Sequence, residues 1–185
     1  MHRRKSMKKQ AFIEQDAVDR ILCQWARERP DLDVSPMGII GRISRIERLL
    51  DPRLVSVFRK FGLERWSFDV LASLRRSGPP YELTPTQLFS SLMLTSGAIT
   101  YRIDEMVKKG FVMRTPDPED RRGQRIRLTD LGQETLDAAL AAHVMNESRI
   151  LEHLSVEERT HLSSLLRQLL LGLEPSPISS RPTEE

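Results

Sequence analysis

The sequence has 185 residues, enough for one domain with a real core or for a small domain with dimerisation arms. Hydrophobic residues make up 39% of the chain and charged residues 30%, which is typical of a globular protein and excludes a disordered one. No apolar run approaches membrane-spanning length, so we expect neither a transmembrane helix nor a secretory signal. A single cysteine excludes an intramolecular disulfide framework and fits a reducing cytoplasm. The net charge is only +3, so binding to a polyanion would depend on where the charge is placed.

The two ends of the chain are polar, and the first predicted helix comes directly after the N-terminal segment. Residues 1–11 are predicted to form a disordered basic arm, and residues 173–185 a disordered tail. A helix is predicted from about Phe12 to Arg29, because Pro30 cannot continue it. Its apolar face consists of Ile13, Ala17, Ile21 and Trp25.

Two further helices are predicted before the centre of the chain. Ser35 and Pro36 combine an N-cap with proline at the first helical position, which predicts the start of the second helix. The Asp51-Pro52 pair is expected to restart or kink that helix. A third helix is predicted over 67–77.

A helix-turn-helix is predicted in the middle of the chain. Thr84 to Gln87 form a capping box with a proline, which predicts the start of the short helix TPTQLFSSL. The next helix is TSGAITYRIDEMVKKG, with Thr95 as its N-cap and Gly110 as its stop. Its apolar stripe consists of Ala98, Ile99, Ile103 and Met106.

A basic β-hairpin is predicted directly after this helix. The segment FVMRTPDPEDRRGQRIRLT has two strand-like runs around a turn rich in proline, aspartate and glycine. Most charge runs are solvated surface, but four arginines within seven residues of one hairpin favour a nucleic-acid contact: Arg121, Arg122, Arg125 and Arg127. A helix followed by a basic hairpin can read one groove of DNA and reach the next, so transcriptional control is the leading interpretation.

Long amphipathic helices are predicted at both ends of this central region. Thr129 caps a helix that reaches about Glu152, and Ser155 and Glu158 form a capping box for the last helix. A small central domain cannot bury so much apolar helix, so we expect a homodimer, the alternative being a monomeric helical bundle. A dimer also places two recognition helices about one DNA turn apart. The predicted fold class is mainly α with a small β-hairpin wing.

The wing segment resembles that of the MarR family of winged-helix regulators. The matching residues are Asp117-Pro-Glu-Asp120-Arg121-Arg122 followed by Leu128-Thr129 and Gly132, and TSGAITYRIDEMVKKG is similar to the family's recognition helix. The resemblance covers roughly residues 12–172. It implies N-terminal helices over 12–62 for dimerisation and a ligand pocket, a winged helix-turn-helix domain over 63–130, and C-terminal dimerisation helices over 131–172.

The resemblance also implies how DNA is bound, with helix 95–109 in the major groove and the wing in a minor groove. Arg122 matches the wing-tip arginine, which would sense a narrow A/T-rich minor groove, and Asp120 matches the residue that holds the hairpin in shape. For Thr86 and Gln87, helix capping is an equally good explanation as a phosphate contact. The residues predicted to contact DNA are Thr86, Gln87, Ser96, Thr100, Tyr101, Arg121, Arg122 and Arg125.

A small-molecule effector is expected from the same resemblance. Segment 25–50 is similar to the urate-responsive, PecS- and HucR-like branch, in which a tryptophan, an aspartate and an arginine line the ligand pocket. The matching residues here are Trp25, Asp69 and Arg102, which suit urate or another aromatic acid. The alternatives are core packing for Trp25, a favourable helix dipole for Asp69, and a local ion pair with Glu105 for Arg102. The branch has asparagine where this chain has Ser77, which leaves the ligand's identity open.

A second route of control would be oxidation of Cys23. This residue lies on the polar stripe of the first helix beside Arg20 and Arg27, which would favour its thiolate. Peroxide-sensing members of the family pair such a cysteine with nearby tyrosines, but Tyr81 and Tyr101 are distant in sequence. An ordinary unreactive thiol is therefore the favoured interpretation.

No catalytic or metal site is predicted. His143, His153 and His161 lie at spacings that match no metal motif, and His143 is expected to face solvent or a partner helix. There is no Gly-rich phosphate loop, so we expect neither an enzyme nor a bound cofactor. A winged helix used as a protein-interaction module is the other alternative, which the arginines of the wing disfavour. The operator, the target genes and the choice between repressor and activator do not follow from the sequence.

Overall fold

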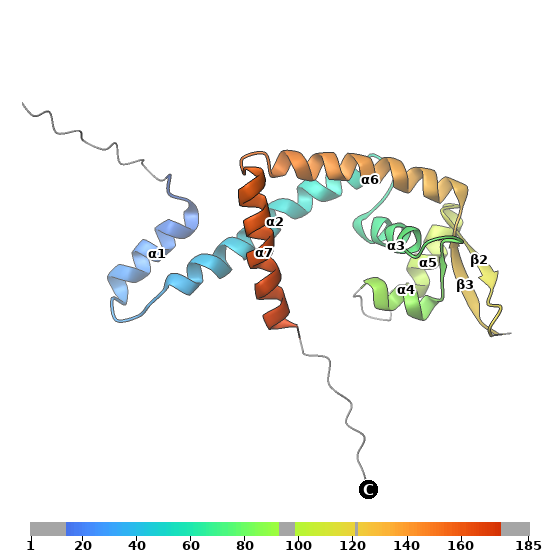
Figure 1. Cartoon of the computed structure of the whole chain (residues 1–185), viewed down its shortest axis with the longest axis horizontal. Coiled ribbons are helices and arrows are strands. Elements are labelled where there is room, and N and C mark those ends of the chain that lie inside the picture. Colours follow the sequence, from blue (N-terminus) through green and yellow to red (C-terminus); the bar gives the residue numbers. More distant parts are fainter. Residues whose placement is uncertain (1–13, 93–98, 121, 175–185) are drawn as a thin grey trace, which may run out of the picture. The chain divides into compact units, whose positions relative to one another are not determined.

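The computed structural model describes residues 14–92, 99–120 and 122–174. It forms two compact units, an N-terminal unit up to Arg53 and a C-terminal unit from Leu54 onward. The fold is mainly helical with one small antiparallel sheet, which confirms the fold class predicted from the sequence (Figure 1). In chain order the elements are α1 (Ala17–Glu28), α2 (Ser35–Arg59), α3 (Arg65–Arg76), β1 (Glu82–Leu83), α4 (Pro85–Leu92), α5 (Ile99–Lys108), β2 (Val112–Pro116), β3 (Gln124–Leu128), α6 (Asp130–Ile150) and α7 (Val156–Leu173).

Helix α1 begins later than the sequence pattern predicts. Asp16 is in an extended conformation, and its carboxylate accepts hydrogen bonds from the backbone N–H groups of Val18 and Asp19. The carboxylate of Asp19 accepts in return from the backbone N–H of Asp16, which completes a capping box. The predicted start at Phe12 is therefore wrong; Phe12 and Ile13 themselves lie outside the described residues.

The N-terminal unit is built by packing α1 on the first half of α2. Val18 is buried, and a Cβ atom at Gly41 would lie 3.4 Å from its side chain, which is an ordinary van der Waals contact and shows that Val18 packs against α2 at this point. Arg42 of α2 joins the two carboxylates of the α1 cap, at 2.8 Å from Asp16 and 2.5 Å from Asp19.

Helix α2 continues through Pro52, so of the restart or kink expected at Asp51-Pro52 the restart is wrong. Proline lacks an N–H group and costs a helix at least one hydrogen bond. The following turns are stabilised instead by burial of their apolar side chains, since Val57 and Phe58 are almost fully covered.

The core of the C-terminal unit lies around α3. Val70, Leu71 and Leu74 of this helix are completely buried. They belong to a core cluster that draws residues from α4, α5, the sheet and α6, including Leu88, Ile103, Met106, Val112, Ile126, Leu128, Leu136 and Ala139. This cluster fixes the helix-turn-helix and the hairpin onto one scaffold.

The sheet has three strands in the order β1-β3-β2, all antiparallel. The hairpin of β2 and β3 confirms the predicted wing, but the short strand β1 was not predicted. Ile126 and Leu128 face the core, whereas Arg125 and Arg127 alternate with them on the other face of β3.

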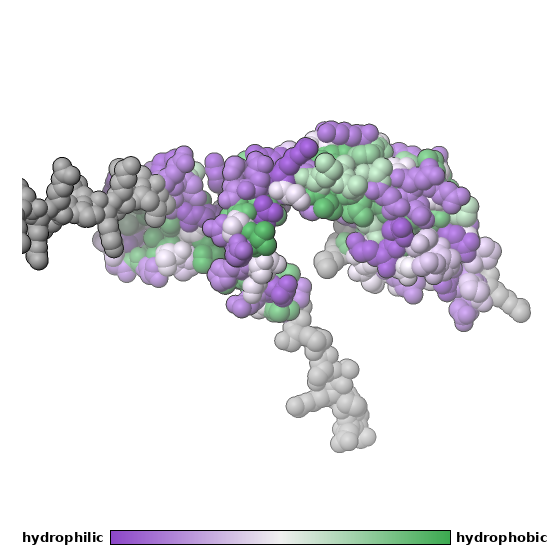
Figure 2. All heavy atoms as spheres, turned by 45° about the horizontal axis from the view of Figure 1, so that its top comes forward, coloured by the Kyte–Doolittle hydropathy of each residue, from purple (hydrophilic) through white to green (hydrophobic). Residues whose placement is uncertain are grey.

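Large apolar side chains remain exposed on the helices outside the winged domain, and Figure 2 shows apolar side chains in green among the hydrophilic surface. In the N-terminal unit they include Ile21, Trp25, Ile39, Ile43, Ile46 and Leu49. In α6 and α7 they include Leu140, Val144, Leu162, Leu165, Leu166 and Leu170. Within the described ranges, no helix combines the length and the apolar character that crossing a bilayer requires.

Candidate nucleic-acid interface

Helix α4 begins with the capping box that its sequence predicts. The backbone N–H of Gln87 donates to Thr84 Oγ1 at 3.2 Å, and the backbone N–H of Thr84 donates to Gln87 Oε1 at 2.9 Å. Thr86 is exposed in the same turn. Capping thus engages the side-chain oxygen of Gln87. Among the described residues, the side-chain N–H groups of Gln87 and the Thr86 hydroxyl stay available to donate hydrogen bonds to a ligand at this end of the helix.

Helix α5 presents one face to the core and the other to solvent. Ile103 and Met106 are buried, whereas Thr100 is exposed and the Tyr101 side chain is 67% exposed. Gly110 ends the helix region with a positive φ of 74°, as its sequence predicts. The predicted N-cap Thr95 and the predicted DNA contact Ser96 lie outside the described residues. Thr100 and Tyr101 therefore lie on the solvent-facing side of α5.

The tip of the wing is organised by Asp117 and Asp120. The carboxylate of Asp120 accepts from the backbone N–H of Arg122 at 2.9 Å, and its carbonyl accepts from the N–H of Gly123 at 2.8 Å. The backbone N–H of Glu119 donates to Asp117 Oδ1 at 3.0 Å, and this bond is the main cause that lowers the pKa of Asp117. These bonds hold the turn and leave the Arg122 side chain exposed, with no carboxylate partner among the described residues. Arg121 lies outside those residues.

The base of the wing contains a network that sequence analysis missed. Glu82 of β1 lies opposite Arg127 of β3, and its Oε2 atom accepts from Arg127 Nε at 2.7 Å. Arg125 donates from Nε to Asp117 Oδ1 at 3.0 Å and lies 3.8 Å from Glu82. The available signal was the alternation of Arg125 and Arg127 along one strand, but nothing in the sequence places Glu82 beside them.

The predicted effector residues fall in both units. Trp25 lies on α1 in the N-terminal unit, with its side chain 43% exposed, whereas Asp69 on α3 and Arg102 on α5 belong to the C-terminal unit. The Arg102 guanidinium lies over the Trp66 ring, 5.5 Å from its centroid. Glu105 pairs instead with Lys108 at 2.8 Å, so the alternative of a local Arg102–Glu105 pair is wrong.

Asp69 is electrostatically unusual. Desolvation raises the pKa of its carboxyl above the ordinary value, outweighing the positive fields of Arg65, Arg76 and His143, which lower it. The residue itself is exposed, so a ligand could reach its carboxyl from solvent.

His143 is placed differently from the prediction that it faces solvent or a partner helix. Its side chain is only 14% exposed, and its ring lies 4.9 Å from that of Phe58 and 5.2 Å from that of Phe68. The aromatic rings of α2 and α3 supply apolar surface that covers it. Cys23 is exposed on α1. In the described ranges, no cluster of histidine, cysteine and acidic side chains could hold a metal ion.

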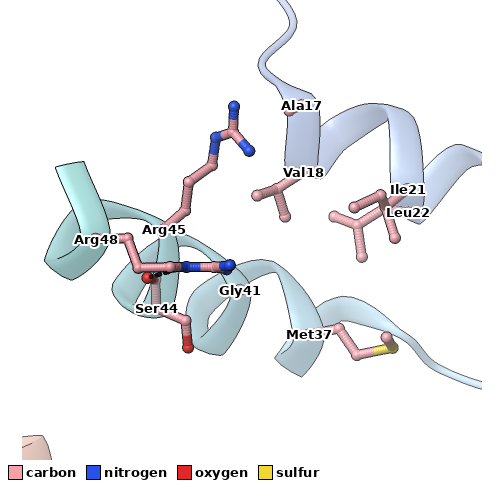
Figure 3. A pocket seen from close by; sticks show the side chains of 9 residues that line it. All are labelled: Ala17, Val18, Ile21, Leu22, Met37, Gly41, Ser44, Arg45 and Arg48. Carbon is pink, nitrogen blue, oxygen red and sulfur yellow. Dashed lines mark hydrogen bonds between the residues drawn. The ribbon is translucent and has the colours of Figure 1, made fainter.

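A groove of about 220 Å³ lies between α1 and α2 in the N-terminal unit (Figure 3). The α1 side chains point toward α2, and Arg48 Nε donates to the Ser44 carbonyl oxygen at 3.2 Å. Its wall contains neither Trp25 nor the other predicted effector residues, so it is not the pocket predicted from the sequence. It is lined by Ala17, Val18, Ile21, Leu22, Met37, Gly41, Ser44, Arg45 and Arg48.

Comparison with known proteins agrees with this geometry. The model of the MarR family matches residues 63–123. The chain is 44% identical over 149 residues to the HTH-type transcriptional regulator PecS of Dickeya dadantii strain 3937, covering 80% of this chain and 90% of the relative. Sco3205 of Streptomyces coelicolor, a MarR family regulator solved in complex with DNA, is 26% identical with a TM-score of 0.69, covering 78% of this chain and 95% of that one. A mutant MarR from E. coli complexed with operator DNA is 25% identical with a TM-score of 0.63, covering 84% and 99% of the two chains. The chain therefore belongs to the MarR family, and it is a DNA-binding transcriptional regulator rather than an enzyme.

Proposed function

We propose that this regulator binds a pseudo-palindromic operator as a homodimer and represses until a small aromatic anion, such as urate, releases it. The proposal of an anionic effector rests on the surroundings of Arg102. This half-buried cation has no carboxylate partner among the described residues, and its guanidinium lies over the indole ring of Trp66. Such a guanidinium can form a charge-assisted hydrogen bond with a planar anion.

The homodimer is supported by the apolar side chains left uncovered. The exposed rows on α1 and α2 and on α6 and α7 are too apolar for a monomer in water, because contiguous exposed patches of this kind mark interaction surfaces. Ser155 caps α7 in a complete capping box, and the leucines of this helix are exposed in the single chain. A second copy of the chain would cover both rows and set the spacing of the recognition helices.

On the DNA, the proposed contacts come from three places in the C-terminal unit. Thr100 and Tyr101, with Ser96, would reach base edges or phosphates in the major groove. Arg122 would enter the adjacent minor groove, since its guanidinium is the free cation at the described part of the wing tip. Thr86 and the amide of Gln87 would touch the backbone.

The effector would bind through Arg102 and Asp69, with Trp25 as the stacking partner. The raised pKa of Asp69 makes its carboxyl a ready hydrogen-bonding partner for a ring N–H group. Because Arg102 lies on α5, directly after the exposed Tyr101, a ligand that pulls on its guanidinium would act directly on the recognition helix.

The test is fluorescence anisotropy of the protein on labelled DNA from upstream of its own gene, titrated with urate. We expect tight, salt-sensitive binding that is lost as urate rises. Trp25→Ala and Arg102→Ala should still bind DNA without urate but should resist release. Normal release of both variants would overturn the assigned pocket.

Two other outcomes point to different effectors. Binding that ignores urate but responds to salicylate would keep the aromatic-anion mechanism with another ligand. Release by peroxide that Cys23→Ser prevents would favour the redox alternative, for which the exposure of the Cys23 thiol is the supporting observation.

A further inference from the structure

Two of the wing arginines are already paired with carboxylates of the protein itself. Arg127 Nη2 lies 2.6 Å from Glu82 Oε2, and Arg125 Nε lies 3.0 Å from Asp117 Oδ1. Arg125 Nη1 lies 3.8 Å from the other oxygen of Glu82, so the four side chains form one network. Two positive and two negative charges cancel, and the base of the wing carries no net charge from these residues.

The carboxylates of this network are more deeply covered than the arginines. The side chains of Glu82 and Asp117 are 10% and 8% exposed, whereas those of Arg127 and Arg125 are 40% and 24% exposed. An arginine that left this network for a phosphate would strand a buried carboxylate without its cation, which is strongly unfavourable. The pairs therefore resist replacement by DNA phosphates.

Of the two remaining arginines in the described wing, one is also paired with a carboxylate and the other is not. Arg114 pairs with Asp104 of α5 at 2.6 Å. Arg122 has only its backbone N–H engaged, by Asp120, and its guanidinium is exposed. The wing thus has several arginines in sequence but presents one described guanidinium without a carboxylate.

We propose that Glu82 is a specificity-determining residue, which neutralises Arg127 and, with Asp117, Arg125, and so restricts the wing's cationic contact with DNA to its tip. Attraction between arginine and phosphate is independent of sequence, so neutralising the wing base lowers non-specific affinity. Reading of minor-groove shape by Arg122 is left intact. The inference rests on the DNA-binding role of the wing, but it needs no effector.

The salt dependence of binding tests this role directly. Each phosphate contact adds about 0.9 to the slope of log K against log[salt], which corresponds to about eightfold in affinity at 0.1 M salt. Glu82→Gln keeps the size of the side chain and removes its charge. We expect its slope to steepen by about 0.9 per protomer, with a larger gain on random-sequence DNA than on operator. Glu119→Gln is the matched control, since it removes a wing charge that has no arginine partner among the described residues, and its slope should stay at the parent value.

A double variant that removes one negative and one positive charge keeps the test decisive if Glu82→Gln alone disturbs the wing. In the double variant Glu82→Gln/Arg127→Gln we expect the parental slope, because both lost charges already cancel. A slope about 0.9 lower per protomer would show that Arg127 contacts phosphate, and would overturn the inference. An unchanged or shallower slope for Glu82→Gln would also overturn it.

Arg122→Gln separates failure of the inference from failure of its premise. This variant should lose about 0.9 of slope per protomer if the tip contacts DNA. An unchanged slope would show that the wing does not reach DNA, and would overturn the premise together with the inference. The effector response plays no part in any of these measurements.

Discussion

Gly132, in the first turn of α6, has the least room for a side chain among the glycines of the described residues. A Cβ atom there would lie 2.0 Å from the carbonyl oxygen of Phe111 and 2.9 Å from its carbonyl carbon. Real Cβ atoms essentially never lie closer than 3.0 Å to such atoms. Gly132→Ala must therefore move the start of α6 away from Phe111 by about 1 Å. The carbonyl cannot retreat, because it accepts from the backbone N–H of Thr129 at 3.2 Å and from its hydroxyl at 3.0 Å.

The magnitude follows from these contacts. Forcing an extra methyl group into a packed site costs about 1–3 kcal/mol. Weakening the two hydrogen bonds from Thr129 to Phe111 adds about 1 kcal/mol for each. We therefore expect Gly132→Ala to lower the free energy of unfolding by about 3–5 kcal/mol, a large part of the total for a domain of ordinary stability.

Urea unfolding followed by circular dichroism measures this change. The midpoint should fall by about 2 M, given the usual dependence of unfolding free energy on urea. Gly172→Ala is the matched control, since a Cβ atom there would meet nothing within 4 Å. It should be neutral or stabilise by about 0.5–1 kcal/mol, because alanine is the better helix former. A Gly132→Ala midpoint equal to that of the parent would refute the close approach of α6 to Phe111.

Three further predictions follow from the wing, the effector site and the terminal helix. Arg122→Ala should weaken binding most on operators with A/T-rich flanks, measured by anisotropy on paired probes; equal loss on G/C-rich flanks would contradict minor-groove reading. Asp69→Asn should be slightly more stable than the parent at pH 7, because desolvation by neighbouring groups raises the folded pKa of this exposed carboxyl above the unfolded value of 3.8 and the ionised form therefore costs stability. Stability in the parent is lost as pH rises from about 3.8 through the folded pKa, so the two urea curves should converge below that window, and a constant difference would rule out the carboxyl as its cause. Deletion of 155–172 should give an unstable or monomeric protein in sedimentation velocity, since it removes an exposed leucine row, and an intact dimer would show that α7 is dispensable for assembly.

Features governed by neighbours a few residues apart were predicted from the sequence. The capping box of Thr84 and Gln87, the cap at Ser155 and the stop at Gly110 all formed as predicted. Each depends on bonds over three or four residues or on one backbone conformation, so local sequence is sufficient. The wing hairpin belongs to the same class, because its turn and its strands are adjacent in the chain.

Some local predictions failed where a competing local signal or tertiary packing decided the outcome. The apolar pattern from Phe12 favoured an earlier helix, but the reciprocal bonds of Asp16 and Asp19 set the start at Ala17. Pro52 was expected to restart or kink α2, and the restart did not occur, since burial of the following turns stabilises the continuous helix.

Side-chain partners far apart in the chain were decided only by the tertiary structure. Glu82 meets Arg127 across 45 residues because β1 adds to the edge of β3, and a two-residue strand has no periodicity from which to be predicted. Arg102 stacks on Trp66 because the core brings α5 against α3. By itself the sequence determined that this is a winged helix-turn-helix regulator with arginines in its wing. Which of those arginines remain free for DNA was decided by the fold, because a carboxylate cancels a guanidinium only when packing places the two within a few ångströms.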